Sequence, residues 1–160
     1  MSLIITSLLW FSAISCGLIA GVCFAFSTFI MSALGRIDHV AGISAMNAIN
    51  VDIVQSLFIV LMLGTTVASA ALAGIAIFRW SEPGAVPMFI GGALFFTGMF
   101  VSTMIFNVPL NDALAAVDPA STEGAALWAR YVSDWTFWNH VRTIASTASF
   151  ALFILSITTR

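Results

Sequence analysis

The sequence predicts an all-α integral membrane protein, built as a bundle of four membrane-spanning helices. Of its 160 residues, 61% are hydrophobic and only 8% are charged, and its mean hydropathy is +1.08. A soluble domain carries about 25% charged residues. A bilayer core of about 30 Å needs roughly 20 apolar residues per helix, and four segments reach that length. We expect one four-span membrane domain over residues 1–160, with spans at about 3–34, 53–80, 86–108 and 137–157.

The first predicted span, residues 3–34, is long enough to tilt or to protrude from the bilayer. Its apolar run continues far beyond the length of a signal sequence, so we expect it to be retained. Small residues recur every four positions from Ala13 to Gly21, a spacing that lets helices approach closely in lipid, within one chain or in a homo-oligomer. Cys16 and Cys23 lie about 10 Å apart along a helix, so we expect two free thiols and no disulfide.

The second and third predicted spans form an antiparallel hairpin. Ser81-Glu82-Pro83-Gly84 separates them, and its proline and glycine mark a turn. Ahead of the hairpin, the spacing of three and four residues that is typical of a helix links Ile37, Val40, Ile43 or Ser44, and Asn47. This recurrence predicts a further helix between the first and second spans.

A set of amides lies at the end of the third predicted span. Thr103, Asn107 and Asn111 are spaced by four residues, which places them on one face if the helix continues. Pro109 removes a backbone donor and should kink the helix. Because unsatisfied amides are costly in hydrocarbon, we expect Asn107 to point into the bundle.

The segment 107–134 is the longest predicted connection outside the membrane. Asp118-Pro119 predicts a helix start, with the acid as N-cap and the proline in the first helical position. An aromatic stripe then runs at three- and four-residue spacing into the fourth span. Such a stripe is more often buried packing than the wall of a cofactor site. Its members are Trp128, Tyr131, Trp135, Trp138 and Arg142.

Aromatic and polar residues are densest at 135–144, WTFWNHVRTI, where the fourth span begins. Ionisable groups at such a place indicate a functional site, whereas tryptophan and arginine are also common where a membrane helix meets water. The residues leave both interpretations open. His140 is the candidate general base, and Arg142 is the candidate partner of an anionic substrate. The candidate donors to a developing oxyanion are Asn107, Asn111 and Asn139.

Haem is the competing ligand, because one or two histidines in an aromatic-lined bundle suffice to hold it. Its axial ligand would be His140 or His39, and Trp135 and Trp138 would line its site. The cofactor is therefore none or haem, and with two histidines we expect no metal centre built from histidines. A non-catalytic membrane subunit or a small transporter, in which the polar groups only seal the bundle, is a further alternative.

Other classes of protein are excluded by motif and charge. The sequence contains no CxxC, HExxH, Walker or GxSxG motif. Its formal net charge is −2, and no basic stripe is present, so nucleic acid is not an expected partner. The expected partners are the lipid bilayer, a small aromatic substrate and a second copy of the chain.

Four segments together resemble the anthrone-oxygenase-like family of small four-span membrane proteins. They are GLIAGVCFAFS at 17–27, MNAIN at 46–50, NVPLN at 107–111 and WNHVRT at 138–143. The first is generic membrane sequence, and the last two are fairly specific. The resemblance covers nearly the whole chain, and some fungal members oxidise polyketide anthrones to anthraquinones with molecular oxygen.

The resemblance implies a membrane oxidase or oxygenase for a small anthrone-like or quinol-like phenol. Its mechanism would be removal of an acidic carbon-bound proton by His140, followed by reaction of the carbanion with oxygen. Asn107, Asn111 and Asn139 would then be the oxyanion donors. Trp135 and Trp138 would suit an aromatic substrate as stacking walls.

The orientation of the chain follows from its charges. Arg79 and Arg160 lie on the side of the termini, and Arg36 and Arg130 lie on the opposite side with six of the seven acids. The basic residues near the span ends set topology, and the acids contribute little. We expect a location in the bacterial inner membrane with both termini cytoplasmic, which places the polar groups near the outer leaflet.

Overall fold

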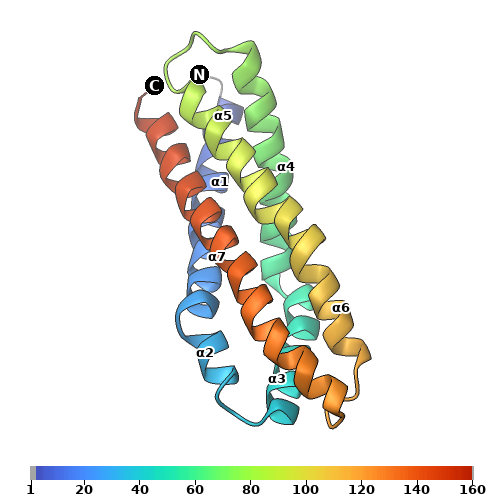
Figure 1. Cartoon of the computed structure of the whole chain (residues 1–160). Helices are drawn as coiled ribbons and strands as arrows, with labels where there is room; N and C mark the ends of the chain where they lie inside the picture. The colour runs from blue at the N-terminus through green and yellow to red at the C-terminus, as the bar shows by residue number, and fades with distance from the viewer. Residues whose placement is uncertain (1–2, 160) are drawn as a thin grey trace.

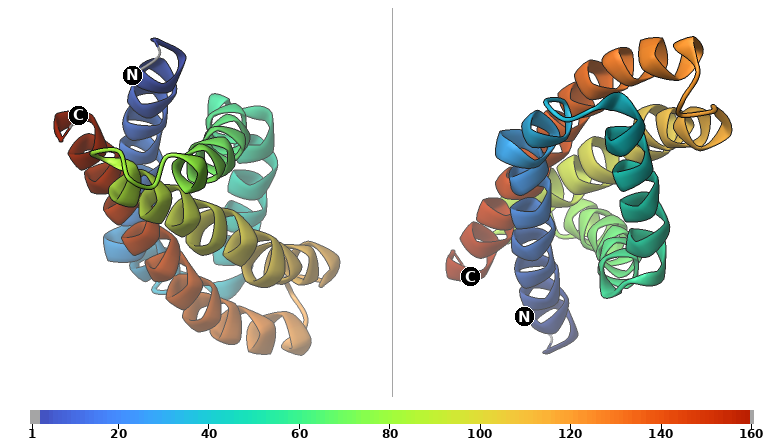
Figure 2. Two further views of the ribbon diagram at one scale, coloured as in Figure 1. Left: turned by 90° about the horizontal axis from the view of Figure 1, so that it is seen from above. Right: turned by 90° about the horizontal axis from the view of Figure 1, so that it is seen from below.

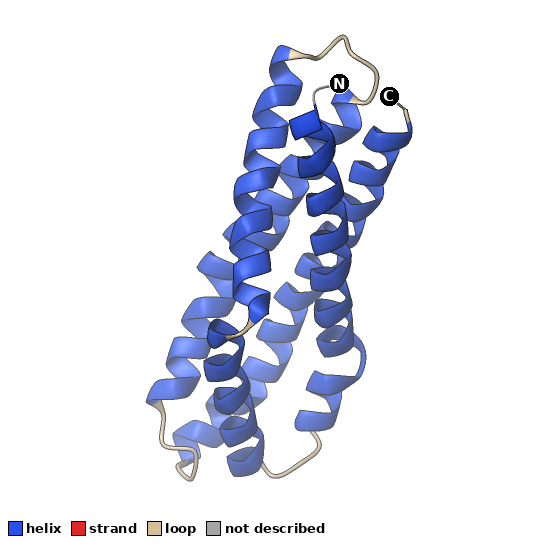
Figure 3. Cartoon of the chain, turned by 180° about the vertical axis from the view of Figure 1, so that it is seen from behind, coloured by secondary structure: helices blue, strands red, loops and turns tan. Residues whose placement is uncertain are grey.

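The computed structural model describes residues 3–159, and this part of the chain is helical with short connections (Figure 1 and Figure 3). This confirms the predicted all-α class. Arg160, used above for orientation, lies outside the described residues. The elements, in order, are α1 (Leu3–Ala25), the π-helical η1 (Phe26–Ile30), α2 (Met31–Leu34), α3 (His39–Gln55), α4 (Leu57–Phe78), α5 (Ala85–Leu94), the π-helical η2 (Phe95–Val101) and η3 (Thr103–Asn107), α6 (Val108–Ala116) and α7 (Thr122–Thr158).

The long helical stretches form a ring of four rods. The first runs from α1 to α2, the second is α4, the third runs from α5 to α6, and the fourth is α7. The rod that begins with α1 packs against α4 and α7, and the rod that begins with α5 packs against the same two helices. Consecutive rods alternate in direction, so the start of α1 and the end of α7 lie at the same end of the bundle (Figure 1). Figure 2 shows the rods from both ends. This is the up-down-up-down arrangement of a four-helix bundle.

Within residues 3–159, four helical stretches are long and apolar enough to cross a membrane. Large apolar side chains cover their outer faces, as lipid contact requires. Examples from three of the rods are Ile14, Leu18, Val60, Val67, Ile77 and Ile144. The chain is therefore an integral membrane protein. The four stretches are Leu3–Leu34, Leu57–Phe78, Ala85–Ala116 and Thr122–Thr158.

The helical stretch that contains the third span is longer than the predicted span. It continues through Pro109 to Ala116 instead of ending at Val108. Pro109 lies in the first turn of α6, directly after the π-helical turn η3. The helix does not end at this point, because the Val108 N–H donates to the Thr103 carbonyl five residues back. The π-helical turn therefore lies next to the position where Pro109 removes a backbone donor.

The helix predicted to run from Asp118-Pro119 into the fourth span exists as α7, but it begins at Thr122 and with a different cap. Ser121, not Asp118, is the N-cap of α7, and its Oγ accepts a hydrogen bond from the Gly124 N–H at 2.9 Å. The Asp118 carboxylate instead accepts from the Ala120 N–H at 3.0 Å within the loop. The predicted connection 107–134 is therefore mostly helical, and only residues 117–121 join the two helices.

The bundle is longer than a bilayer core is thick. The 37 residues of α7 span about 55 Å, whereas the 22 residues of α4 span about 33 Å, close to the hydrocarbon thickness. We therefore place the bilayer around α4. The remaining end of the bundle, made of α2, α3, α6 and the first turns of α7, extends beyond it (Figure 1). It carries Asp38, Asp52, Asp112, Asp118, Glu123 and Asp134.

Two buried clusters follow this division of the bundle. The membrane core lies around α4 and includes Leu9, Ile19, Leu72, Met88 and Phe153. The cap core packs α2, α3, α6 and α7 together in the end that extends beyond the bilayer. It consists of Met31, Ile43, Met46, Leu114, Trp128, Tyr131 and Trp135. The predicted helix between the first two spans exists as α3 and contributes to this cap core. A Cβ at Gly42 would lie 2.6 Å from Trp128 Cζ2, so glycine is required where α3 meets α7.

Labelling of single cysteines should report the two ends of the bundle on opposite sides of the membrane. Glu82 lies in the turn between α4 and α5, and Ala120 lies in the loop before α7; both residues are exposed. The two native cysteines are buried and free, so they should stay unlabelled by a membrane-impermeant maleimide. In vesicles of one orientation, Glu82→Cys and Ala120→Cys should react from opposite faces. Reaction of both from one face would contradict the four-span topology.

Candidate functional site

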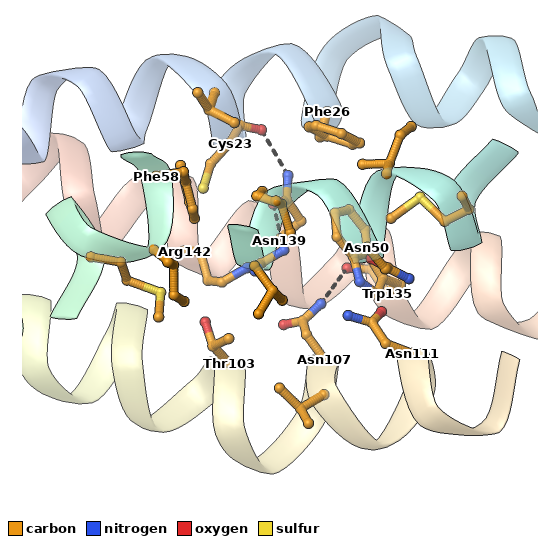
Figure 4. A pocket seen from close by; sticks show the side chains of 18 of the residues that line it. Cys23, Phe26, Asn50, Phe58, Thr103, Asn107, Asn111, Trp135, Asn139 and Arg142 are labelled. Carbon is orange, nitrogen blue, oxygen red and sulfur yellow. Dashed lines mark hydrogen bonds between the residues drawn. The ribbon is translucent and has the colours of Figure 1, made fainter. Parts of the chain in front are cut away.

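A cavity of about 150 Å³ lies between the membrane core and the cap core (Figure 4). A cavity of this size holds one benzene-sized molecule. Its walls are mostly apolar and come from α1, η1, α3, α4, η3, α6 and α7. Its polar lining residues are Asn50, Thr103, Asn107, Asn111, Asn139 and Arg142.

Arg142 is the cation of the cavity, and no anionic partner for it lies in the part of the chain that the structure describes. It is only 7% exposed, its Nη2 donates to Asn139 Oδ1 at 2.7 Å, and its Cζ lies 4.8 Å from the centroid of the Trp135 ring. Its buried Nε has no hydrogen-bond partner. Among the described residues, no Asp or Glu lines the cavity. An unpaired buried charge is costly, and the cation–π contact offsets only part of that cost.

Asn139 holds the guanidinium in place. Its Nδ2 donates to the Cys23 carbonyl and to Ser27 Oγ, both at 2.7 Å, while its Oδ1 accepts from Arg142 (Figure 4). These bonds tie α7 to the junction of α1 and η1. Both amide hydrogens are already in use, so in this arrangement Asn139 has no donor left for a ligand. It positions Arg142.

The other two predicted amides also lie at the cavity. Asn107 is 1% exposed, as predicted, and its Nδ2 donates to the Trp135 carbonyl at 3.2 Å. Asn111 Oδ1 accepts from the Tyr131 hydroxyl at 2.7 Å. Asn107 Oδ1 and Trp135 Nε1 are buried and have no partner. Arg142 Nε and Asn50 Nδ2, on two further lining residues, are also buried without a partner, so a polar ligand could satisfy atoms of this group.

The structure brings together five of the residues predicted from sequence. They come from the end of the third rod and from the fourth rod, and all of them line the cavity. The ring of Trp135, predicted as a stacking wall, contacts Phe26, Tyr131 and Arg142. The five are Asn107, Asn111, Trp135, Asn139 and Arg142.

Three predicted residues lie elsewhere. His140 is exposed on α7, about 100° around the helix from Asn139, and does not line the cavity. His39 is the first residue of α3, with its Nδ1 3.7 Å from Asp38 Oδ2. Trp138 stacks on Phe106, with centroids 3.4 Å apart, in a groove between α6 and α7 on the outside of the bundle.

The cavity does not fit haem. In the described part of the chain, neither histidine lines it, so it offers no axial imidazole. Its volume suits one six-membered ring, far less than a porphyrin. Residues 3–159 also contain no group of three His, Cys, Asp or Glu side chains placed to hold a metal ion.

Several cavity residues were not predicted as site residues. Thr103 has a signal in the sequence, since it shares the four-residue spacing of Asn107 and Asn111. Cys23 and Phe26 on the first rod have none, because their position depends on how α1 pairs with α7. Phe58 and Met62 are further residues of this kind, whereas Asn50 lies in the segment MNAIN that contributed to the resemblance.

Fold and site together define a four-helix membrane protein with a buried cationic cavity of the size of one aromatic ring. The family model of anthrone oxygenase matches residues 51–152, which is more than half of the chain. The chain belongs to the anthrone oxygenase family. The matched region contains Asn107, Asn111, Asn139 and Arg142, but not the α1 part of the cavity. No curated protein and no solved structure matches the chain.

Proposed function

We propose that this chain is a membrane oxidase or oxygenase that oxidises a small aromatic phenol or enol with molecular oxygen inside the cavity. The observation that carries this proposal is Arg142, a buried guanidinium without a carboxylate, in a cavity the size of one aromatic ring. Membership of the anthrone oxygenase family supports the same class of reaction.

The expected reaction converts an acidic methylene group beside a phenolic ring into a ketone. The conjugate base of such a substrate shares its negative charge between carbon and oxygen. Arg142, and the unpaired Trp135 Nε1–H, would stabilise charge on that oxygen, while the carbon supplies electrons to O2. One oxygen atom enters the substrate, and the other leaves as water with both methylene hydrogens.

The cavity could expand to bind a substrate larger than one aromatic ring, because several of its wall side chains are flexible. Met46, Met62 and Met104 line it, and methionine side chains adapt their shape readily. The lining residues Val54 and Met104 are apolar and are 61% and 48% exposed, so they would form the mouth of the cavity. An apolar mouth on the outside of a membrane bundle would admit an aromatic substrate from the bilayer.

Filling the cavity should strongly reduce oxygen uptake. In Met62→Trp, the larger side chain would occupy the site, and we expect at least about a tenfold loss of activity, since a misplaced substrate loses the pre-organised contacts that lower the barrier. Val60→Trp is the matched control on α4, because Val60 is 62% exposed and faces outward. The measurement is O2 consumption with anthrone, and incorporation of isotopically labelled oxygen into the ketone product.

Two outcomes would count against the proposal. Equal activity of Met62→Trp and the wild type would place the chemistry outside the cavity. Absence of oxygen uptake with every phenol and anthrone tested, in folded protein, would favour the non-catalytic subunit or transporter.

A further inference from the structure

We propose that the cavity binds its ligand as an anion, the conjugate base of a weakly acidic phenol or enol, and that ionisation of the ligand replaces a general base in the site. For the reaction, this inference rests on the proposed function. For binding, it rests on the lining of the cavity and the surroundings of Arg142.

No residue that could act as a general base lines the cavity within residues 3–159. Among its described lining residues, only Cys23 and Arg142 carry a titratable side chain. Arg142 stays protonated in a protein. Cys23 is 3% exposed in an apolar wall, where a thiol stays protonated and inert. A ligand in this cavity therefore touches no imidazole and no carboxylate that could remove its proton.

The charge of Arg142 distinguishes the neutral form of such a ligand from its anion. A neutral phenol leaves the guanidinium buried without a counter-charge, whereas a phenolate compensates it. Charges interact more strongly in a low-dielectric interior than in water. Asn139 and the Trp135 ring already hold the guanidinium, so little reorganisation is needed when the anion binds. The cavity should therefore prefer the anion.

This preference limits the class of substrate. A substrate must have an appreciable fraction of its anion near neutral pH, as do phenols bearing an electron-withdrawing group and enols conjugated with aromatic rings. An ether of the same shape has no anion and should be excluded. The rate of oxidation should then follow the acidity of the substrate.

The test uses 4-nitrophenol, a single-ring acid whose anion is coloured and whose neutral form is not. With the protein in detergent, we expect bound 4-nitrophenol to stay ionised at least about one pH unit below the free compound, which corresponds to about tenfold tighter binding of the anion. 4-Nitroanisole, which cannot ionise, should not compete. Arg142→Gln should lose the shift. Arg130→Gln, on the same helix but 73% exposed and paired with Asp134, should keep it.

Three results would overturn the inference: neutral 4-nitrophenol in the bound state, no binding of either form to folded protein, or equal competition by 4-nitroanisole. The comparison of the two compounds needs only the wild type, so it decides even if Arg142→Gln does not fold. Anion binding without oxygen uptake from any substrate would refute the proposed function alone. Oxygen uptake at a rate independent of substrate acidity would refute the inference alone.

Discussion

Replacing Arg142 by methionine is expected to remove activity while leaving the bundle at least as stable as the wild type. The substitution removes the charge that would stabilise the substrate oxyanion, and loss of one such interaction costs about 10²- to 10³-fold in rate. It also removes a buried charge without a counter-ion, which favours the folded state. Asn139 Oδ1 loses its donor, at a cost of about 1 to 3 kcal/mol. On balance, we expect the free energy of unfolding to be unchanged or up to about 2 kcal/mol higher.

The measurement is oxygen uptake per folded molecule together with the unfolding midpoint in detergent. Arg130→Met is the control, because it removes an exposed arginine and its surface ion pair with Asp134, worth about 0 to 1 kcal/mol. It should leave activity per folded molecule intact. If Arg142→Met lowers stability and activity in proportion, the guanidinium seals the bundle and has no role in chemistry.

The number of spans was predictable because the apolar runs reach the thickness of a bilayer. The ends of the third and fourth spans were not, since α6 and the first turns of α7 extend beyond the bilayer and need no apolar run. Their limits depend on local hydrogen bonds instead, such as the bond from the Gly124 N–H to Ser121 Oγ. Asp118 offers an equally good capping sequence, and nothing in the composition decides between the two.

Within the fourth span, the sequence indicated the right stretch but not the right face. Trp135, Asn139 and Arg142 are buried together, at spacings of four and three residues. The predicted stripe used Trp138 in place of Asn139, because an aromatic side chain is the more obvious member of a buried face. With Trp138 in the stripe, the predicted buried face of α7 includes Trp138 and His140, which in the structure do not face the cavity. The role proposed for His140 stays a prediction from the sequence.

The cavity itself needed tertiary information. Its polar half was predictable, because amides and an arginine within a membrane bundle must turn inward. Its other wall comes from α1 and η1, and only the pairing of α1 with α7 brings the Cys23 carbonyl to Asn139. No spacing in the sequence encodes that register.

The contact between Asn139 and Arg142 provides a second test, in which the charge is compensated instead of removed. Asn139→Asp would put a carboxylate oxygen where the amide oxygen lies, 2.7 Å from Arg142 Nη2. The carboxylate would become the missing counter-ion and would compete with an anionic substrate. We expect oxygen uptake to fall about 10²-fold, as in Arg142→Met, although the arginine is still present.

The same substitution also removes two donors, to the Cys23 carbonyl and to Ser27 Oγ. Interhelical hydrogen bonds in membranes are worth about 0.6 to 2 kcal/mol each, and the new ion pair offsets part of that loss. Asn47→Asp is the matched control: Asn47 donates to the Leu114 carbonyl at 3.3 Å and does not line the cavity. It should lower stability by a similar amount and keep its activity per folded molecule. If Asn139→Asp oxidises substrate at the wild-type rate per folded molecule, an uncompensated charge on Arg142 is not what the reaction requires, because the carboxylate would have neutralised it without effect.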